Sequence, residues 1–198
     1  MRNFVRLVKN DEFVQECLRI HNHYRADHGS PCLHLSTEVS AFSQKWADRL
    51  AKEDHFHHSN HPKYGENLFV SYMSDNSLPM ATAKEVVESW YAEQKFYPFG
   101  CHITRDIIYK AGHFTQVIWR NSRELGIGRS ISRTNRVYVV ANYFPAGNVF
   151  NKFEDNVRER LHQKFLSPQT FLQPQISYTR RLSSRRMNLS AFHTERII

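Results

Sequence analysis

The chain has 198 residues, of which 40% are hydrophobic and 23% charged, and this composition suits one domain with a packed core. It contains no run of about 18 apolar residues, and Arg6 interrupts an N-terminal stretch that is too short for the apolar part of a signal peptide. Three cysteines (Cys17, Cys32 and Cys101) do not form a disulfide framework. We therefore expect a cytoplasmic protein without a transmembrane segment, with unconventional export left open.

Two helices are predicted in the first quarter of the chain. The first covers residues 11–28 and places apolar residues on one face at helical spacing: Phe13, Cys17, Ile20 and Tyr24. The second covers residues 37–53, with Ser36 as its N-cap. Its predicted buried stripe is Val39, Phe42, Trp46 and Leu50. A polar, histidine-rich stretch follows over residues 54–64.

A third helix is predicted over residues 83–96, where Thr82 and Glu85 form a capping box. Glu93 stands seven residues after Val86, a rotation of only about 20° around an α-helix. Glu93 is therefore expected on the same buried face as Val86 and Trp90. A buried carboxylate without a partner is costly, so this position predicts a polar site inside the protein.

The remaining pattern favours strands over residues 114–119, 125–131 and 137–144, and a strand is also expected to begin at residues 65–70. Helices followed by antiparallel strands indicate an α+β fold. We expect residues 1–10 to be a short N-terminal segment and residues 11–157 to be the folded domain.

Residues 158–198 are expected to form a basic, disordered tail. Nine Lys and Arg residues against four Asp and Glu residues in 151–198 supply five of the eight net positive charges. Its four central arginines (Arg180, Arg181, Arg185 and Arg186) are either a solvated basic tail or a surface for anionic membranes. Because no nucleic-acid-binding motif accompanies this charge, we expect no nucleic-acid partner.

Four segments, in this order, resemble the CAP superfamily of cysteine-rich secretory, antigen 5 and pathogenesis-related proteins. They are HNHYR (21–25), YGENL (64–68), GHFTQVIW (112–119) and VVANY (139–143). The resemblance implies an α-β-α sandwich with an antiparallel central sheet. Ala141 stands where secreted members usually carry a cysteine, which is similar to the intracellular, Golgi-associated branch. Arg2 stands where a lipid-anchored member needs its acceptor glycine.

The resemblance also implies a cleft with two histidines and two glutamates, which by motif are His58, Glu66, Glu93 and His113. His58 and His113 are then candidate ligands of a divalent metal, with Zn²⁺ as the expected ion and Glu66 and Glu93 as orienting carboxylates. Two alternatives stay open: a hydrogen-bonded polar cluster that positions the third helix, and general acid–base catalysis. We also consider that the histidine run at 55–61 chelates a metal by itself.

The resemblance favours a non-enzymatic protein that binds lipids or an anionic membrane surface, through the cleft or the basic tail, and lies peripherally at Golgi or other anionic membranes. No catalytic residue is assigned, since neither Ser59 nor Thr115 belongs to a recognised nucleophile motif. The competing hypotheses are a hydrolase or protease that uses the cleft, and an interaction or signalling module that forms homodimers.

Overall fold

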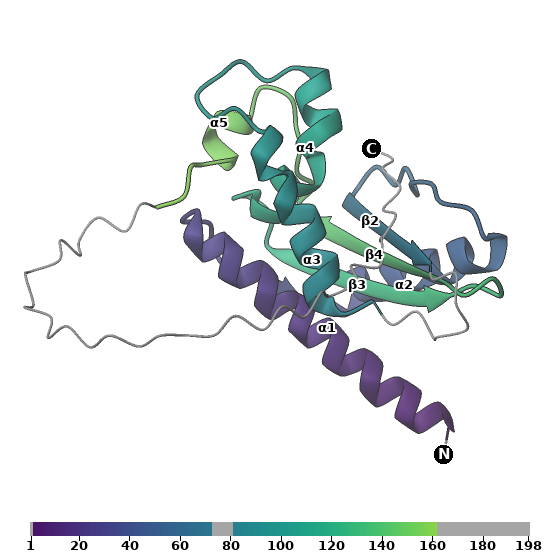
Figure 1. The fold of residues 1–198 in the computed structure, drawn as a ribbon. Coiled ribbons are helices and arrows are strands. Elements are labelled where there is room, and N and C mark those ends of the chain that lie inside the picture. The colour runs from purple at the N-terminus through teal and green to yellow at the C-terminus, as the bar shows by residue number, and fades with distance from the viewer. Residues whose placement is uncertain (1, 73–80, 162–198) are drawn as a thin grey trace, which may run out of the picture.

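The computed structural model describes residues 2–72 and 81–161, with the backbone alone described for residues 2–10. The elements, in chain order, are α1 (Arg2–Asp27), β1 (His34–Leu35), α2 (Thr37–Glu53), β2 (Gly65–Tyr72), α3 (Ala83–Tyr91), η1 (Ala92–Phe96), α4 (Arg105–Ile118), β3 (Glu124–Ile131), β4 (Arg136–Phe144) and α5 (Phe153–Asn156). Helices cover both faces of one twisted sheet (Figure 1).

The sheet has the strand order β1-β3-β4-β2. β4 is antiparallel to both of its neighbours, β2 and β3, whereas the short β1 runs parallel to β3. The predicted α+β fold is confirmed, and the sheet is mixed but largely antiparallel. β4 is buried without interruption from Val137 to Tyr143, because a central strand covered on both faces exposes neither set of alternating side chains.

Successive side chains of the strands point to opposite faces of the sheet and contribute to two separate hydrophobic cores. Leu68 and Val70 of β2, with Tyr138 and Val140 of β4, pack against α2. Phe69 and the alternate residues of β4 pack on the opposite face, against side chains of α1, α3 and α4. In Figure 1, α2 lies behind the sheet, and α1 and α3 lie in front of it. This arrangement is the expected α-β-α sandwich.

α2 lies unusually close to β3. A Cβ added at Gly126 would sit 2.3 Å from the backbone of Val39, and one at Gly128 would sit 2.4 Å from the backbone of Ser43. The face of α2 turned to the sheet is therefore built mainly from small residues, with Val39 and Leu50 near its ends: Val39, Ser43, Ala47, Leu50 and Ala51.

The predicted stripe on α2 was thus only half correct. Val39 and Leu50 are buried, whereas Phe42 and Trp46 are half-buried and pack sideways against the histidine-rich loop. Large aromatic side chains cannot face a sheet at the separation that the two glycines set.

The strand predicted over residues 114–119 was wrong, because these residues belong to α4 up to Ile118. All side chains from Ala111 to Ile118 are buried, so the stretch shows neither the helical nor the strand period in its polarity. β-branched residues have only a weak preference against helix, and tertiary packing overrides it here.

Other boundaries also differ. α1 begins at Arg2, well before the predicted start at residue 11, and the predicted helix over 83–96 divides into α3 and η1. Residues 158–161 pack back on the end of α1, where Leu161 N donates to Asp27 O. Residues 162–198, including the four tail arginines, lie outside the described residues. No helix in the described ranges combines the length and apolarity needed to cross a membrane.

We predict that Gly126→Ala lowers the free energy of unfolding by about 3 kcal/mol, because the new methyl must displace the α2 backbone. Denaturant titration followed by circular dichroism measures this effect. Ile131→Val, at the partly exposed end of the same strand, is the control and should stay within about 0.5 kcal/mol of wild type. A similarly small effect of Gly126→Ala would show that α2 is not held against β3.

Candidate functional site

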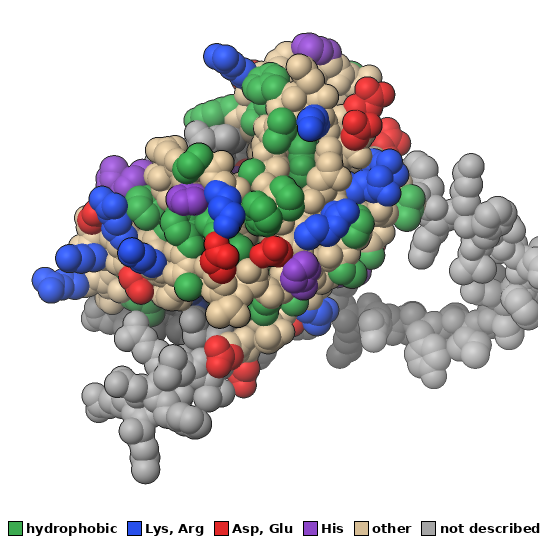
Figure 2. Space-filling view, turned by 180° about the vertical axis from the view of Figure 1, so that it is seen from behind, with side chains coloured by type: hydrophobic (Ala, Val, Ile, Leu, Met, Phe, Trp, Pro, Cys, Tyr) green, Lys and Arg blue, Asp and Glu red, His purple; other side chains and the backbone are tan. Residues whose placement is uncertain are grey.

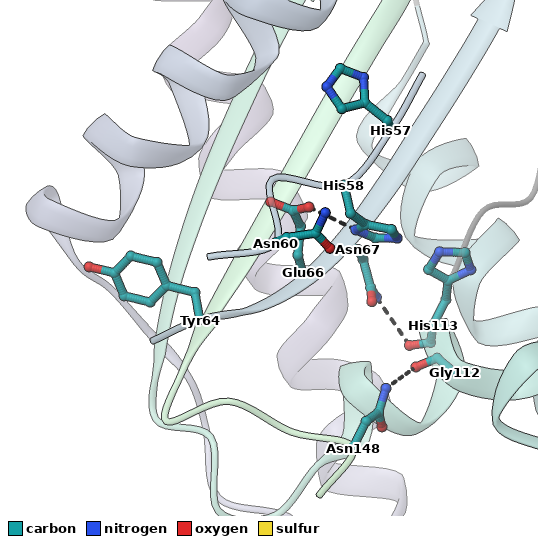
Figure 3. Close-up of a pocket in the computed structure, with 9 residues that line it drawn as sticks. All are labelled: His57, His58, Asn60, Tyr64, Glu66, Asn67, Gly112, His113 and Asn148. Atoms are coloured by element: carbon teal, nitrogen blue, oxygen red, sulfur yellow. Dashed lines mark hydrogen bonds and ion pairs between the residues drawn. The ribbon is translucent and has the colours of Figure 1, made fainter. Parts of the chain in front are cut away.

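A cavity of about 420 Å³ opens where the histidine-rich loop, the start of β2 and the middle of α4 meet. Its lining is predominantly polar and aromatic (Figure 3): His57, His58, Asn60, Tyr64, Glu66, Asn67, Gly112, His113 and Asn148. Three of the four residues that the sequence indicated lie on its walls. The fourth, Glu93, is buried and contacts His113.

One wall carries the pair His58 and Glu66. Glu66 Oε1 lies 2.7 Å from His58 Nδ1 and accepts a hydrogen bond from Ser59 N (2.8 Å), while Glu66 Oε2 accepts one from Asn142 Nδ2 (3.1 Å). The strand register explains the last contact, since Glu66 of β2 is paired with Asn142 of β4. Of the closely spaced histidines, His58 is the one placed against Glu66.

The environment of Glu66 favours its charged form. Burial is the largest single influence and opposes ionisation, but the hydrogen bonds from His58, Ser59 and Asn142 together outweigh it and hold the pKa of Glu66 below its ordinary value. The Glu66 carboxylate therefore orients the His58 ring and favours the tautomer that is protonated at Nδ1.

The other wall carries the pair His113 and Glu93. Glu93 Oε1 lies 2.9 Å from His113 Nδ1, and Glu93 Oε2 accepts a hydrogen bond from the backbone N–H of His113 (3.1 Å). α4 is kinked at Ala111 (φ −131°, ψ 15°), so Gly112–Ile118 begins as a new helical segment whose first N–H groups lack intrahelical partners. Glu93 caps that segment and orients its histidine at the same time.

Glu93 itself follows the sequence argument. Val86, Trp90 and Glu93 are all buried, although Glu93 lies in the tighter η1 turn and not in a continuous α-helix. The buried face of α3 and η1 thus places the Glu93 carboxylate at the N-terminus of the buried half of α4.

The second nitrogen of His113 has no partner. Nε2 is buried, and among the described residues no hydrogen-bonding group reaches it. Figure 3 shows the imidazoles of His58 and His113 on facing walls of the cavity. Within residues 2–72 and 81–161, no group of three or more His, Cys, Asp or Glu residues is arranged to hold a metal ion. The cleft therefore offers two imidazoles, each with a carboxylate behind it.

A buried hydrogen-bond chain connects this wall to α1. Asn67 Nδ2 donates to His113 O (3.1 Å) and to Tyr143 Oη (3.2 Å), and Tyr143 Oη lies 2.8 Å from His21 Nε2. His21 Nδ1 contacts Cys17 O (2.7 Å). Residues from all four sequence motifs therefore form one network, which motif matching alone did not reveal.

Sequence reasoning missed the residues that hold the cavity floor. Asn148 donates from Nδ2 to Gly112 O (2.9 Å) and accepts from Thr115 Oγ1 (2.6 Å), while Gln116 Oε1 accepts from Gly147 N (2.9 Å). A Cβ at Gly65 would sit 2.0 Å from Gln116 Oε1, so only glycine allows this approach. The signal available in the sequence was a run of polar and glycine residues beside a buried strand.

The two hydroxyls near the site histidines are committed to other partners. Thr115 Oγ1 donates to Gly112 O (3.1 Å) and Asn148 Oδ1. The Ser59 side chain hydrogen-bonds to Glu66 and accepts from His61 N (3.3 Å). Proximity in sequence to His58 and His113 therefore did not translate into serine–histidine or threonine–histidine pairs.

Comparison with known proteins identifies the family of this chain. Residues 18–143 match the model of the cysteine-rich secretory protein family, named CAP. The chain belongs to the CAP family. The Golgi-associated plant pathogenesis-related protein 1 of Homo sapiens is 37% identical over 152 residues, which cover 74% of this chain and 92% of that protein. Pathogenesis-related protein 1C of Nicotiana tabacum is 38% identical over 139 residues, which cover 70% of this chain and 78% of that protein.

Solved structures agree on the CAP fold. A crystal structure of NaASP2 with Zn²⁺ aligns with a TM-score of 0.59 at 23% identity, covering 74% of this chain and 84% of that one. The structure of BmVAL-1 aligns equally well, with a TM-score of 0.59 at 21% identity and coverage of 74% and 79%.

The buried network predicts acid sensitivity. Burial is the dominant influence on His21 and lowers its pKa from 6.5 to about 4. Between these values the unfolded chain binds a proton that the folded chain does not, so stability falls as pH drops from about 6.5 to 4, by on the order of 3 kcal/mol. Denaturant titrations across this range measure the loss.

NMR titration of His21, assigned with a His21→Gln variant, should give a midpoint near 4. A midpoint near 6.5 would contradict the burial argument, because it would mean that the folded state accepts the imidazolium at no cost.

Proposed function

We propose that this CAP protein is a non-enzymatic module that holds a Zn²⁺ ion between His58 and His113 and associates with anionic membrane surfaces. The observation that carries the metal half of the proposal is the buried Nε2 of His113, a residue that lines the cavity; no hydrogen-bonding group in the described part of the chain reaches this atom. Buried polar atoms are rarely left unsatisfied, so this atom calls for a ligand.

The donor set fits zinc. Each imidazole has a carboxylate at Nδ1, which is the arrangement that fixes the tautomer of a metal-bound histidine and raises its basicity. His58 and His113 would supply two nitrogen ligands through Nε2, and Glu66 and Glu93 would act behind them. Bound zinc would supply Lewis acidity and would link the histidine-rich loop to α4. The related NaASP2 has been crystallised with Zn²⁺.

The membrane half of the proposal is supported by charge and by kinship. The arginines at 180, 181, 185 and 186 concentrate positive charge within seven residues, and each basic residue near an anionic surface contributes about 1 kcal/mol. The human relative is named for its Golgi association. We accordingly place this protein in the cytoplasm, peripherally at Golgi or other anionic membranes.

The absence of a catalytic role in this proposal is supported by the hydroxyl groups. The Ser59 side chain interacts with Glu66, and the Thr115 hydroxyl donates to Gly112 and Asn148. Neither hydroxyl is therefore presented to His113 as a nucleophile. The carboxylate–imidazole pairs serve to orient the two rings.

We predict that chelator-treated protein binds Zn²⁺ and that His58→Ala/His113→Ala removes one equivalent, as measured by elemental analysis and calorimetry. Glu66→Gln and Glu93→Gln should each weaken that equivalent by about 10–100-fold, because they release the ring from its orienting carboxylate. His34→Ala, at an exposed position outside the cleft, is the control. Zinc stoichiometry that is unchanged in the double variant would refute the ligand assignment.

We further predict that the protein co-sediments with phosphatidylserine vesicles at low salt. Replacing Arg180, Arg181, Arg185 and Arg186 by glutamine should weaken this binding by roughly 10²–10³-fold. Neutral phosphatidylcholine vesicles are the control, and the binding should fall as salt rises. If wild type and the quadruple variant sediment equally with anionic vesicles, the tail is not the membrane-binding element.

A further inference from the structure

Beyond the cleft and independently of it, we propose a second metal site on the surface, in which the Nδ1 atoms of His55 and His57 chelate Cu²⁺. The two atoms lie 3.0 Å apart and share a hydrogen bond, so Cu²⁺ would take the place of the shared proton, which is released to solvent. Figure 3 shows that the imidazole of His57 points away from His58 and His113, although its residue borders the cavity. The face that carries α2 has histidine side chains at its surface beside basic and acidic side chains (Figure 2).

The side chains of Asp54 and Phe56 anchor the loop at this pair. Asp54 ends α2 in a left-handed conformation (φ 51°) and accepts hydrogen bonds from Thr134 Oγ1 (2.6 Å) and Tyr138 Oη (2.9 Å). Two residues later, Phe56 is buried in the core between α2 and the sheet. Phe56 lies between the two histidines and is buried, whereas His55 is exposed and His57 is half-buried, so both imidazoles remain accessible from solvent.

Trp46 holds His57 in place. Trp46 Nε1 donates to His57 O (3.3 Å), and the indole meets the imidazole edge-on with ring centroids 5.1 Å apart. The half-buried Phe42 and Trp46 that the sequence assigned to the core of α2 thus support the loop. The imidazoles of His55 and His57 are tilted by 34° with centroids 4.8 Å apart, so both rings are pre-positioned.

The nearby charge of Glu53 favours one tautomer of His57. Glu53 Oε2 faces His57 Nε2 at 4.0 Å, while Arg49 Nε donates to Glu53 Oε1 (2.8 Å) and fixes the carboxylate. A carboxylate beside Nε2 favours the proton on that nitrogen and leaves the lone pair on Nδ1. His55 is exposed, so water can solvate its Nε2–H when its own Nδ1 is deprotonated.

The spacing is closer to that of a tetragonal site than to that of a tetrahedral site. Two nitrogens each about 2.0 Å from one ion and 3.0 Å apart subtend roughly 97° at that ion. Adjacent positions of a tetragonal Cu²⁺ site require about 90°, whereas tetrahedral Zn²⁺ would require nitrogens roughly 3.3 Å apart. Cu²⁺ is also the divalent ion that imidazole ligands bind most tightly. The chelate has two protein ligands, so water completes the coordination, in keeping with the absence of any larger ligand cluster among the described residues.

The test is a Cu²⁺ titration of the purified protein, read by calorimetry and by electron paramagnetic resonance. We expect a tetragonal Cu²⁺ signal with coupling to two imidazole nitrogens. His55→Ala should weaken this class of site by roughly 10²-fold, because the chelate becomes a single ligand. Glu53→Gln should weaken it by roughly tenfold.

The matched control is His61→Ala, in the same loop. His61 stacks on Tyr64 and its Nδ1 accepts a hydrogen bond from Lys63 N, so its removal should leave Cu²⁺ binding unchanged. His55→Ala should also be compared with its parent in a His58→Ala/His113→Ala background. There the cleft histidines are gone, so the effect of His55→Ala on Cu²⁺ binding does not depend on whether the cleft holds zinc. Equal Cu²⁺ affinity and stoichiometry in His55→Ala and wild type, or coupling to a single nitrogen, would overturn the proposal.

Discussion

The buried guanidinium of Arg25 is the interaction on which the rest of the structure depends. It lies at the end of α1 and donates to four backbone carbonyls: Pro31 O (2.8 Å), Val117 O (3.0 Å), Trp119 O (2.8 Å) and Ser122 O (2.9 Å). Burial lowers the pKa of Arg25 to about 10, which leaves it cationic at neutral pH. A cation at the C-terminus of α4 satisfies carbonyls that the helix cannot, and it complements the helix dipole.

Arg25 at one end of the buried half of α4 has its counterpart at the other end. Glu93 accepts the backbone N–H of His113, so a carboxylate caps the N-terminus of the segment whose C-terminus the arginine caps. Both charges come from distant segments, α1 and η1. Helix capping and the geometry of the cleft are therefore linked. The same Glu93 that accepts the unpaired backbone N–H at the start of this helical segment also orients the imidazole of His113.

One device recurs across the molecule. His58 with Glu66, His113 with Glu93 and His57 with Glu53 each place a carboxylate against one ring nitrogen and leave the other nitrogen directed elsewhere. In the cleft both pairs are largely buried, and the two rings come from separate walls. On the loop the rings of His55 and His57 come from neighbouring residues and meet through Nδ1. The two arrangements differ in burial and in the ring nitrogens that they would offer to a metal, and we propose distinct ions for them.

Local patterns in the sequence determined the α+β class, the strands of β3 and β4, the capping box at Thr82 and the burial of Glu93, because each depends on spacing along one element. Two of the four motifs also contain residues that line the cleft, among them Glu66 and His113, whereas Asn148 lies outside all four. Only the tertiary structure decided that residues 114–118 are helical, since the charges that stabilise this helix lie far away at Arg25 and Glu93. It also decided which histidine of the loop meets Glu66 and which two meet each other. Periodicity encodes which side chains are buried, but partners are chosen by packing between elements that the sequence does not place in space.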